Sequence, residues 1–160
     1  MDWFSKAFLK SSLAWLTIGV TLGAAMAIAP SLAIYRLAHV HMNLIGFVGM
    51  MIAGVAYHVV PRFTGHPLHS RRLAGAHWWL ANVGLAIFVA GFALRPLGFR
   101  SSPLLLGIGG SLSALGMYLF AYNLWRTIDT PGLRLPIMAR ESSAVVPAPP
   151  SRVLATLQPR

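Results

Sequence analysis

The chain has 160 residues, of which 56% are apolar and only 10% are charged. Because an ordinary soluble domain carries about a quarter charged residues, this composition excludes a water-soluble globule and indicates a membrane protein. The chain contains no cysteine, which excludes disulfide scaffolds, thiolate metal sites, iron–sulfur clusters and covalent haem attachment through Cys-x-x-Cys-His. The formal net charge is +10, but the basic residues form no single run, so we do not expect nucleic-acid binding.

Four stretches, at residues 11–35, 37–61, 73–94 and 101–125, contain no Asp, Glu, Lys or Arg, and each exceeds the roughly 20 residues that a helix needs to cross a bilayer. They predict transmembrane helices at about residues 11–29, 37–60, 77–94 and 103–125, the second ending before Pro61. Short connections favour an antiparallel arrangement. The expected fold is therefore an all-α, integral membrane four-helix bundle within residues 1–128. Residues 129–160 are rich in proline, have no apolar period and are expected to form a flexible, disordered cytoplasmic tail.

The basic residues flank the predicted spans and therefore serve as topology signals. In a four-helix topology ten of them lie on one side of the membrane: Lys6, Lys10, Arg62, Arg71, Arg72, Arg126, Arg134, Arg140, Arg152 and Arg160. Arg36, Arg95 and Arg100 lie on the other side. This distribution places both termini in the cytoplasm of a bacterial cell, with the helices in its cytoplasmic membrane. One alternative is that the first apolar run is a cleaved secretory signal, since Ala25-Met26-Ala27 imitates a cleavage site.

Ionisable groups at membrane depth are costly and usually face a partner, a cavity or a cofactor. His39 and His41 fall near the start of the second predicted helix, about 200° apart around its axis. They point to opposite faces and can serve two separate partners, such as two haems, but cannot readily chelate one ion while the helix stays regular. The alternative is that they bond to water at the headgroup boundary. Met26, on another helix at a similar depth, could supply a thioether ligand.

The other four histidines belong to the opposite end of the predicted bundle. His58 and His77 end one helix and begin the next, and His66 and His69 lie between them. Four histidines at one end could bind zinc or copper. The alternative is two loop histidines in water and two interfacial ones.

Together these segments resemble a known family. The segment Ala38-His-Val-His-Met-Asn-Leu-Ile-Gly-Phe-Val-Gly, continuing to Arg62, resembles the haem-ligating helix of haem–copper oxidase subunit I, especially its cbb-type and nitric-oxide-reductase branch. Residues 72–84 are similar to the start of that family's next helix, and residues 120–128 to the end of its final helix. The resemblance covers about residues 37–128 and corresponds to the last four of the family's twelve helices.

The resemblance implies non-covalent haem b and assigns roles to several residues. His39 matches the proximal ligand of the high-spin haem, and His41 matches one axial ligand of the low-spin haem. Arg36, Arg95 and Arg100 occupy positions near the haem propionates, where charge-assisted bonds would form. Gly46 and Gly49 of the same segment are counted among the cofactor-binding candidates.

The departures from the family limit what the resemblance implies. The copper-binding histidines, the cross-linked tyrosine and the other low-spin haem ligand belong to family helices with no counterpart here. We therefore expect neither copper nor complete oxygen reduction by this chain alone. A second axial ligand would be Met26, a nonprotein ligand or a histidine from another subunit, and the last option favours a homo-oligomer.

The resulting hypothesis is a haem b protein that passes electrons to or from a respiratory-chain partner, or binds nitric oxide or oxygen. Two alternatives remain. One is an accessory subunit that completes a haem site with a partner oxidase or reductase. The other is a metal-handling membrane protein that uses His58, His66, His69 and His77.

Overall fold

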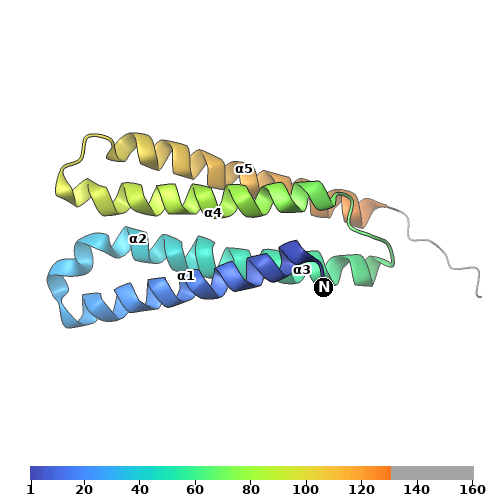
Figure 1. Cartoon of the computed structure of the whole chain (residues 1–160), viewed down its shortest axis with the longest axis horizontal. Coiled ribbons are helices and arrows are strands. Elements are labelled where there is room, and N and C mark those ends of the chain that lie inside the picture. Colours follow the sequence, from blue (N-terminus) through green and yellow to red (C-terminus); the bar gives the residue numbers. More distant parts are fainter. Residues whose placement is uncertain (131–160) are drawn as a thin grey trace, which may run out of the picture.

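A computed structural model of the chain describes residues 1–130 and shows four long antiparallel helical rods that follow one another in space as in sequence (Figure 1). The first rod is α1 (Trp3–Ile28), and the third and fourth are α4 (Arg71–Leu94) and α5 (Ser102–Asp129). The second rod is composite: a 3₁₀ turn (Pro30–Tyr35), α2 (Arg36–His41), a π-helical segment (Met42–Gly49) and α3 (Met50–Thr64). Each rod is long and apolar enough to cross a membrane, which confirms the predicted four-helix membrane fold. The expected tail lies outside the described residues, apart from its first two positions.

The helices are longer than predicted because they continue through the charged residues that flank the apolar stretches. Helix α1 begins at Trp3 rather than Ser11 and includes Lys6 and Lys10, whose apolar stems can lie along a helix while the ammonium groups reach water. Helix α4 begins at Arg71 rather than His77 because Ser70 caps it, accepting a hydrogen bond from the backbone N–H of Leu73 at 3.3 Å. A charge-free window thus locates the apolar part of each rod but not its ends.

Pro61 does not terminate the second rod, contrary to the prediction. Helix α3 continues three residues beyond Pro61 to Thr64 and then ends at Gly65. Gly65 has φ of 74°, a left-handed conformation that favours glycine and closes helix C-termini. Proline lacks an N–H group, so its cost inside a helix is one lost hydrogen bond and a local clash. Near the end of the rod this cost is tolerated.

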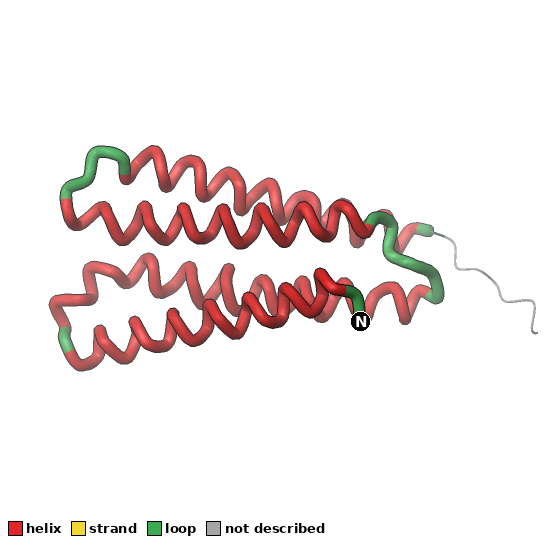
Figure 2. The backbone as a smooth tube through the Cα atoms, in the orientation of Figure 1, coloured by secondary structure: helices red, strands yellow, loops and turns green. Residues whose placement is uncertain are grey.

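The prediction also assumed that the second rod is a regular α-helix, and the structure differs from it. Its π-helical segment begins directly after His41. Such segments are rare and are found frequently at functional sites. Figure 2 shows that the rod nevertheless remains continuous between the turns at its two ends.

The buried core is concentrated at the end of the bundle where the N-terminus lies (Figure 1). Phe4 and Phe8 of α1 are fully buried and pack against the ring of Tyr57 of α3. His77 of α4 joins this aromatic cluster, with its ring centroid 4.6 Å from that of Phe8. Aromatic packing at this end therefore ties the first three rods together.

Helices α4 and α5 approach each other closely along glycines. A Cβ atom added at Gly109 of α5 would overlap the backbone of Phe88 and Gly84 of α4, and one added at Gly84 would meet the backbone nitrogen of Ser113 at 2.7 Å. Small residues of this kind allow membrane helices to pack backbone against backbone. This close packing makes α4 and α5 a tight pair.

Candidate functional site

The six residues that the sequence analysis named as candidate haem ligands or propionate partners lie toward one end of the bundle. Arg36 begins α2, His39 and His41 follow it within two turns, and Arg95 and Arg100 lie in the connection between α4 and α5. Met26 lies near the end of α1. In Figure 1 this is the left-hand end, away from the N-terminus. The helix boundaries therefore bring all six residues to one region.

His39 is half-buried and faces α1. Its Nδ1 lies 2.8 Å from the carbonyl oxygen of Gly19. A Cβ atom at Gly23 would lie 2.7 Å from Cε1 of the same ring, so the imidazole occupies the space that this glycine leaves. Gly23 thus leaves space for the histidine ring, and Gly19 supplies its hydrogen-bond acceptor.

His41 is also half-buried but faces α4. Its ring stacks on Phe92 with centroids 4.8 Å apart and meets the edge of Phe88 at 4.9 Å. Its Nδ1 lies 2.7 Å from the carbonyl oxygen of Leu37, one turn earlier in the same helix. Two aromatic rings and one hydrogen bond therefore orient this imidazole.

The hydrogen bonds define which nitrogen of each ring carries the proton. A carbonyl oxygen can only accept, so Nδ1 of both His39 and His41 must donate. Asn43 also approaches Nδ1 of His39, at 3.3 Å, but its amide nitrogen is closer to the backbone carbonyl of His39, at 2.9 Å. We assign the amide hydrogen bond to that carbonyl. Each neutral imidazole then keeps the lone pair on Nε2.

This arrangement is suited to binding a metal ion. Metal-ligating histidines commonly donate their other ring N–H to a backbone carbonyl or a carboxylate, which fixes the tautomer and raises ligand basicity. Both His39 and His41 meet this condition, on opposite sides of one helix. The two donor nitrogens therefore suit two separate partners, one on each side of the helix, better than one shared ion.

The three arginines are exposed at this end. Within residues 1–130 the single ion pair is elsewhere, between Arg71 and Asp2, so the guanidinium groups of Arg36, Arg95 and Arg100 have no acidic partner among the described residues. Met26 is half-buried and follows Gly23 by three residues, on the same side of α1.

Gly46 and Gly49 differ in their surroundings. A Cβ atom at Gly46 would lie 2.7 Å from the Trp15 side chain of α1 and 2.9 Å from the Leu85 side chain of α4. Gly46 thus permits close packing of three rods. Gly49 is less crowded, its nearest such neighbour being the carbonyl oxygen of Leu44 at 3.5 Å.

The remaining histidines lie toward the opposite end, and the structure does not bring them together as a metal cluster. His77 is buried, and its Nδ1 lies 3.1 Å from the Tyr57 hydroxyl. His58 bonds to Arg62, and His66 is 3.3 Å from the carbonyl oxygen of Pro67. No group of three or more His, Asp or Glu side chains in the described part of the chain could hold a metal ion. The proposed four-histidine cluster is therefore not formed.

Sequence reasoning missed three side chains next to the ligand candidates: Asn43, Phe88 and Phe92. Asn43 follows His39 by four residues, a spacing that places both on one helix face, and a polar residue in an apolar run was a usable signal. Phe88 and Phe92 show the same spacing on α4, but only the packing of two rods shows that they face His41.

The architecture and the site define a class: an integral membrane four-helix bundle that presents two imidazoles on opposite sides of one transmembrane helix. Comparison with known proteins agrees with this class, although no family profile matches the chain. The cbb3-type cytochrome c oxidase subunit CcoN1 of Stutzerimonas stutzeri is 30% identical over 152 aligned residues, covering 76% of this chain and 32% of that protein. Cytochrome c oxidase subunit 1 of Rhodobacter capsulatus is 28% identical over 119 residues, covering 59% and 22%.

The chain is thus a relative of the haem–copper oxidase subunit I family. It spans about a third of the length of CcoN1 and less than a quarter of the second relative. A further relative, the cytochrome c oxidase subunit 1 homolog of Bradyrhizobium diazoefficiens bacteroids, is 26% identical over 119 residues.

Proposed function

We propose that this chain is a membrane-embedded haem b protein whose iron ligands are His41, His39 or both. The observation that carries the proposal is the pair of carbonyl hydrogen bonds at Nδ1 of these rings, at 2.7 and 2.8 Å, which leaves each Nε2 free to ligate. Haem would supply one-electron redox chemistry or an iron site for a small gas. Relatives named as cytochrome oxidase subunits support this cofactor.

The surrounding residues would orient the ligands and tune them. Phe92 stacks on the His41 ring and Phe88 packs against it edge-to-face, so these two side chains would hold the plane of the ring. The Gly19 carbonyl and the space at Gly23 hold His39 against α1. Axial ligation and an apolar environment are the main means by which a protein sets haem potential.

The three arginines at this end would neutralise the haem propionates. Arg36, Arg95 and Arg100 are exposed and can form charge-assisted hydrogen bonds with carboxylates, often through two nitrogens at once. All three lie toward the end of the bundle that carries His39 and His41, where they would be available to the propionates.

A homo-oligomer would complete the coordination. Both histidines lie on one rod, so a second protein ligand for either iron must come from Met26 or from another subunit. A second copy of this chain is the simplest source. Two ligands favour electron transfer with a respiratory partner, whereas one open position favours nitric oxide or oxygen binding.

An absorption spectrum of the detergent-purified protein, oxidised and reduced, with haem quantification tests this proposal. We expect a Soret band that is lost or shifted in His41→Ala or His39→Ala and retained in His69→Ala, an exposed histidine at the other end. Sharp reduced α and β bands indicate two ligands. Broad high-spin bands that shift with carbon monoxide indicate an open position. Absence of haem after growth with ample haem supply contradicts the proposal.

A second candidate is an accessory subunit of a larger oxidase or reductase. The observation in its favour is that the relatives are themselves named as subunits, and this chain spans only a part of each. In that case haem would be lost on purification of the chain alone. It would be retained when the chain is purified with its partner, and His41→Ala would remove it from the complex.

A further inference from the structure

An open groove lies between α1 and α4 at the end of the bundle that carries the N-terminus. Its volume is about 370 Å³, and its lining residues are Trp3, Arg71, Arg72, Gly75, Ala76 and Trp79. Helices α1 and α4 both begin at this end, so the groove lies where the membrane-spanning rods enter the bilayer. None of its residues belongs to the candidate haem site.

Two indole rings form the walls of the groove. Trp3 and Trp79 are 54% and 61% exposed, which is unusual for side chains of this size unless they meet a lipid or a partner. A Cβ atom at Gly75 would lie 3.1 Å from Trp3, so this glycine lets the indole lie across α4. Tryptophan is enriched at membrane interfaces because its ring is apolar and its N–H group is polar.

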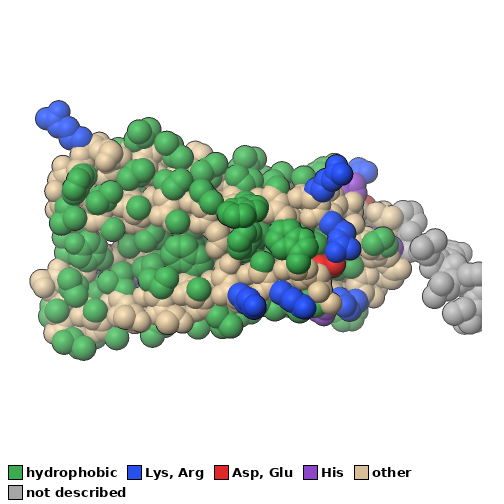
Figure 3. Space-filling view, in the orientation of Figure 1, with side chains coloured by type: hydrophobic (Ala, Val, Ile, Leu, Met, Phe, Trp, Pro, Cys, Tyr) green, Lys and Arg blue, Asp and Glu red, His purple; other side chains and the backbone are tan. Residues whose placement is uncertain are grey.

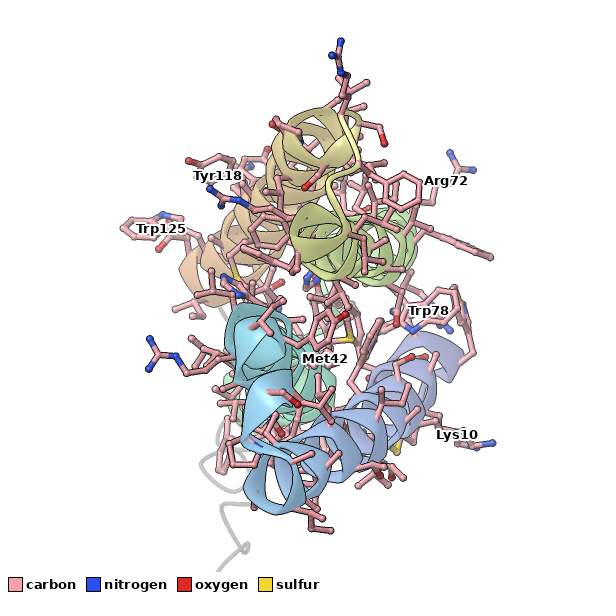
Figure 4. All side chains as sticks on the ribbon, turned by 90° about the vertical axis from the view of Figure 1, so that its left-hand side faces the viewer. Lys10, Met42, Arg72, Trp78, Tyr118 and Trp125 are labelled. Carbon is pink, nitrogen blue, oxygen red and sulfur yellow. The ribbon has the colours of Figure 1, made fainter. Side chains whose placement is uncertain are left out.

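The charge of the groove is positive and only partly neutralised. Arg71 forms an ion pair with Asp2 at 2.7 Å, the single ion pair among residues 1–130. Arg72 therefore has no acidic partner within the described residues. Trp3, Lys6 and Lys10 share one side of α1, and Figure 4 shows Lys10 and Arg72 projecting toward the same side of the bundle, with Trp78 between the two helices.

The wider surface agrees with this local charge. In Figure 3 most of the visible Lys and Arg side chains gather toward the right-hand end of the bundle, and a hydrophobic surface extends from there along the helices. On the groove side, Arg72 is followed at helical spacing by Trp79 and then by Val83, which is 43% exposed. A basic group thus lies above aromatic and then aliphatic surface.

We propose that this groove binds the headgroup of an anionic phospholipid, with Arg72 as the main contact for the phosphate. Guanidinium groups bind phosphate through paired, charge-assisted hydrogen bonds. The indoles of Trp3 and Trp79 contact the glycerol region, and an acyl chain extends along α4 past Val83. A free phosphate ion would contact only the arginine, whereas a lipid contacts the basic, the aromatic and the aliphatic parts of this surface.

The test compares lipid retention by native mass spectrometry for the purified full-length protein and two single variants. Arg72→Gln removes the phosphate contact, and Arg126→Gln removes an exposed arginine of α5 that does not line the groove, with the same change in net charge. Phosphatidylglycerol is the anionic probe and phosphatidylcholine the neutral one. We expect wild type and Arg126→Gln to retain phosphatidylglycerol preferentially, and Arg72→Gln to bind it about tenfold more weakly because the charge-assisted contact with the phosphate is lost.

Several results would overturn the proposal. Equal retention of phosphatidylglycerol by wild type and Arg72→Gln excludes Arg72 as the phosphate contact, and an equal loss in Arg126→Gln shows an effect of net charge only. If inorganic phosphate raises the unfolding temperature of the protein as much as phosphatidylglycerol does, the groove binds a phosphate ion and not a lipid. If Arg72→Gln does not fold, Arg72→Lys replaces it, since lysine keeps the charge but not the paired geometry, and it must show retention between those of wild type and the phosphatidylcholine background.

Discussion

Two histidines only two residues apart have different surroundings because the helix turns their side chains to different neighbours. His39 packs against Gly23 of α1, where the space available to its ring is limited. His41 is held between phenylalanines of α4, where ring orientation is the constraint. In both, a backbone carbonyl fixes the tautomer. The proposed ligand function therefore depends on residues that carry no ligating atoms, and these can be tested.

Gly23→Ala tests the space around His39. The added methyl group would lie 2.7 Å from Cε1 of the ring, so the imidazole or the α1 backbone must move, at a cost of about 1–3 kcal/mol if the site behaves like an overpacked core. We expect lower haem content and a shifted Soret band with unchanged helical circular dichroism. Gly107→Ala, where the added carbon meets nothing within 4 Å, is the matched control. An unaltered spectrum in Gly23→Ala would exclude His39 as a ligand in this rotamer.

The arginines provide a charge test at the same end. Arg95→Gln combined with Arg100→Gln should weaken haem retention and lower the haem reduction potential, because two positive charges that stabilise the propionates and the reduced state are removed. Arg62→Gln with Arg126→Gln, two arginines toward the opposite end, is the matched control. A redox titration of both double variants checks this, and equal shifts in the two would show that position does not matter.

At the scale of single residues, the sequence predicted the ligand candidates but not their supports. The spacing of His39 and His41 requires opposite faces on any helix, so the separation of the two rings follows from the sequence. The contacts of Phe92 and Gly23 depend on which rods are neighbours and on how far each rod is shifted along the bundle axis. The sequence of a single helix determines neither of these.

At the scale of elements, the tight pairing of α4 and α5 depends on glycines that lie directly against the backbone of the other helix. Gly109→Ala should destabilise the protein by about 1–3 kcal/mol or more, because the added carbon overlaps backbone atoms of α4 that cannot rotate away. Thermal unfolding in detergent measures the loss. Gly107→Ala, two residues earlier on the same helix, should unfold at the wild-type temperature within error. Equal stability of both variants would contradict the close packing.

The charge-free stretches of the sequence predicted where the rods lie but not where they begin and end. Ser70 and Gly65 are local signals for a helix start and a helix end, and both were readable in the sequence. The π-helical segment was not, because the residues of Met42–Gly49 other than Asn43 are common in ordinary membrane helices. Packing of Gly46 between Trp15 and Leu85 accompanies that segment, and such three-rod contacts are not encoded in a local pattern.

At the scale of the whole molecule, basic residues are distributed unequally between the two ends of the rods. Within residues 1–130, Lys6, Lys10, Arg62, Arg71, Arg72 and Arg126 lie toward one end, and Arg36, Arg95 and Arg100 lie at the other. Short loops rich in arginine and lysine stay in the cytoplasm. We therefore infer that the end with the N-terminus faces the cytoplasm and that the candidate haem site lies near the outer face.

The absence of cysteine makes this topology directly testable, since any introduced thiol is the single one. Ser101→Cys is in the exposed connection between α4 and α5, and Thr130→Cys is exposed just beyond α5. We expect a membrane-impermeant maleimide applied to spheroplasts to label Ser101→Cys at once and Thr130→Cys only after the membrane is disrupted. The reverse pattern would place the histidine site near the cytoplasmic face, where its electron donor would have to be a cytoplasmic or cytoplasm-facing protein rather than an outer one.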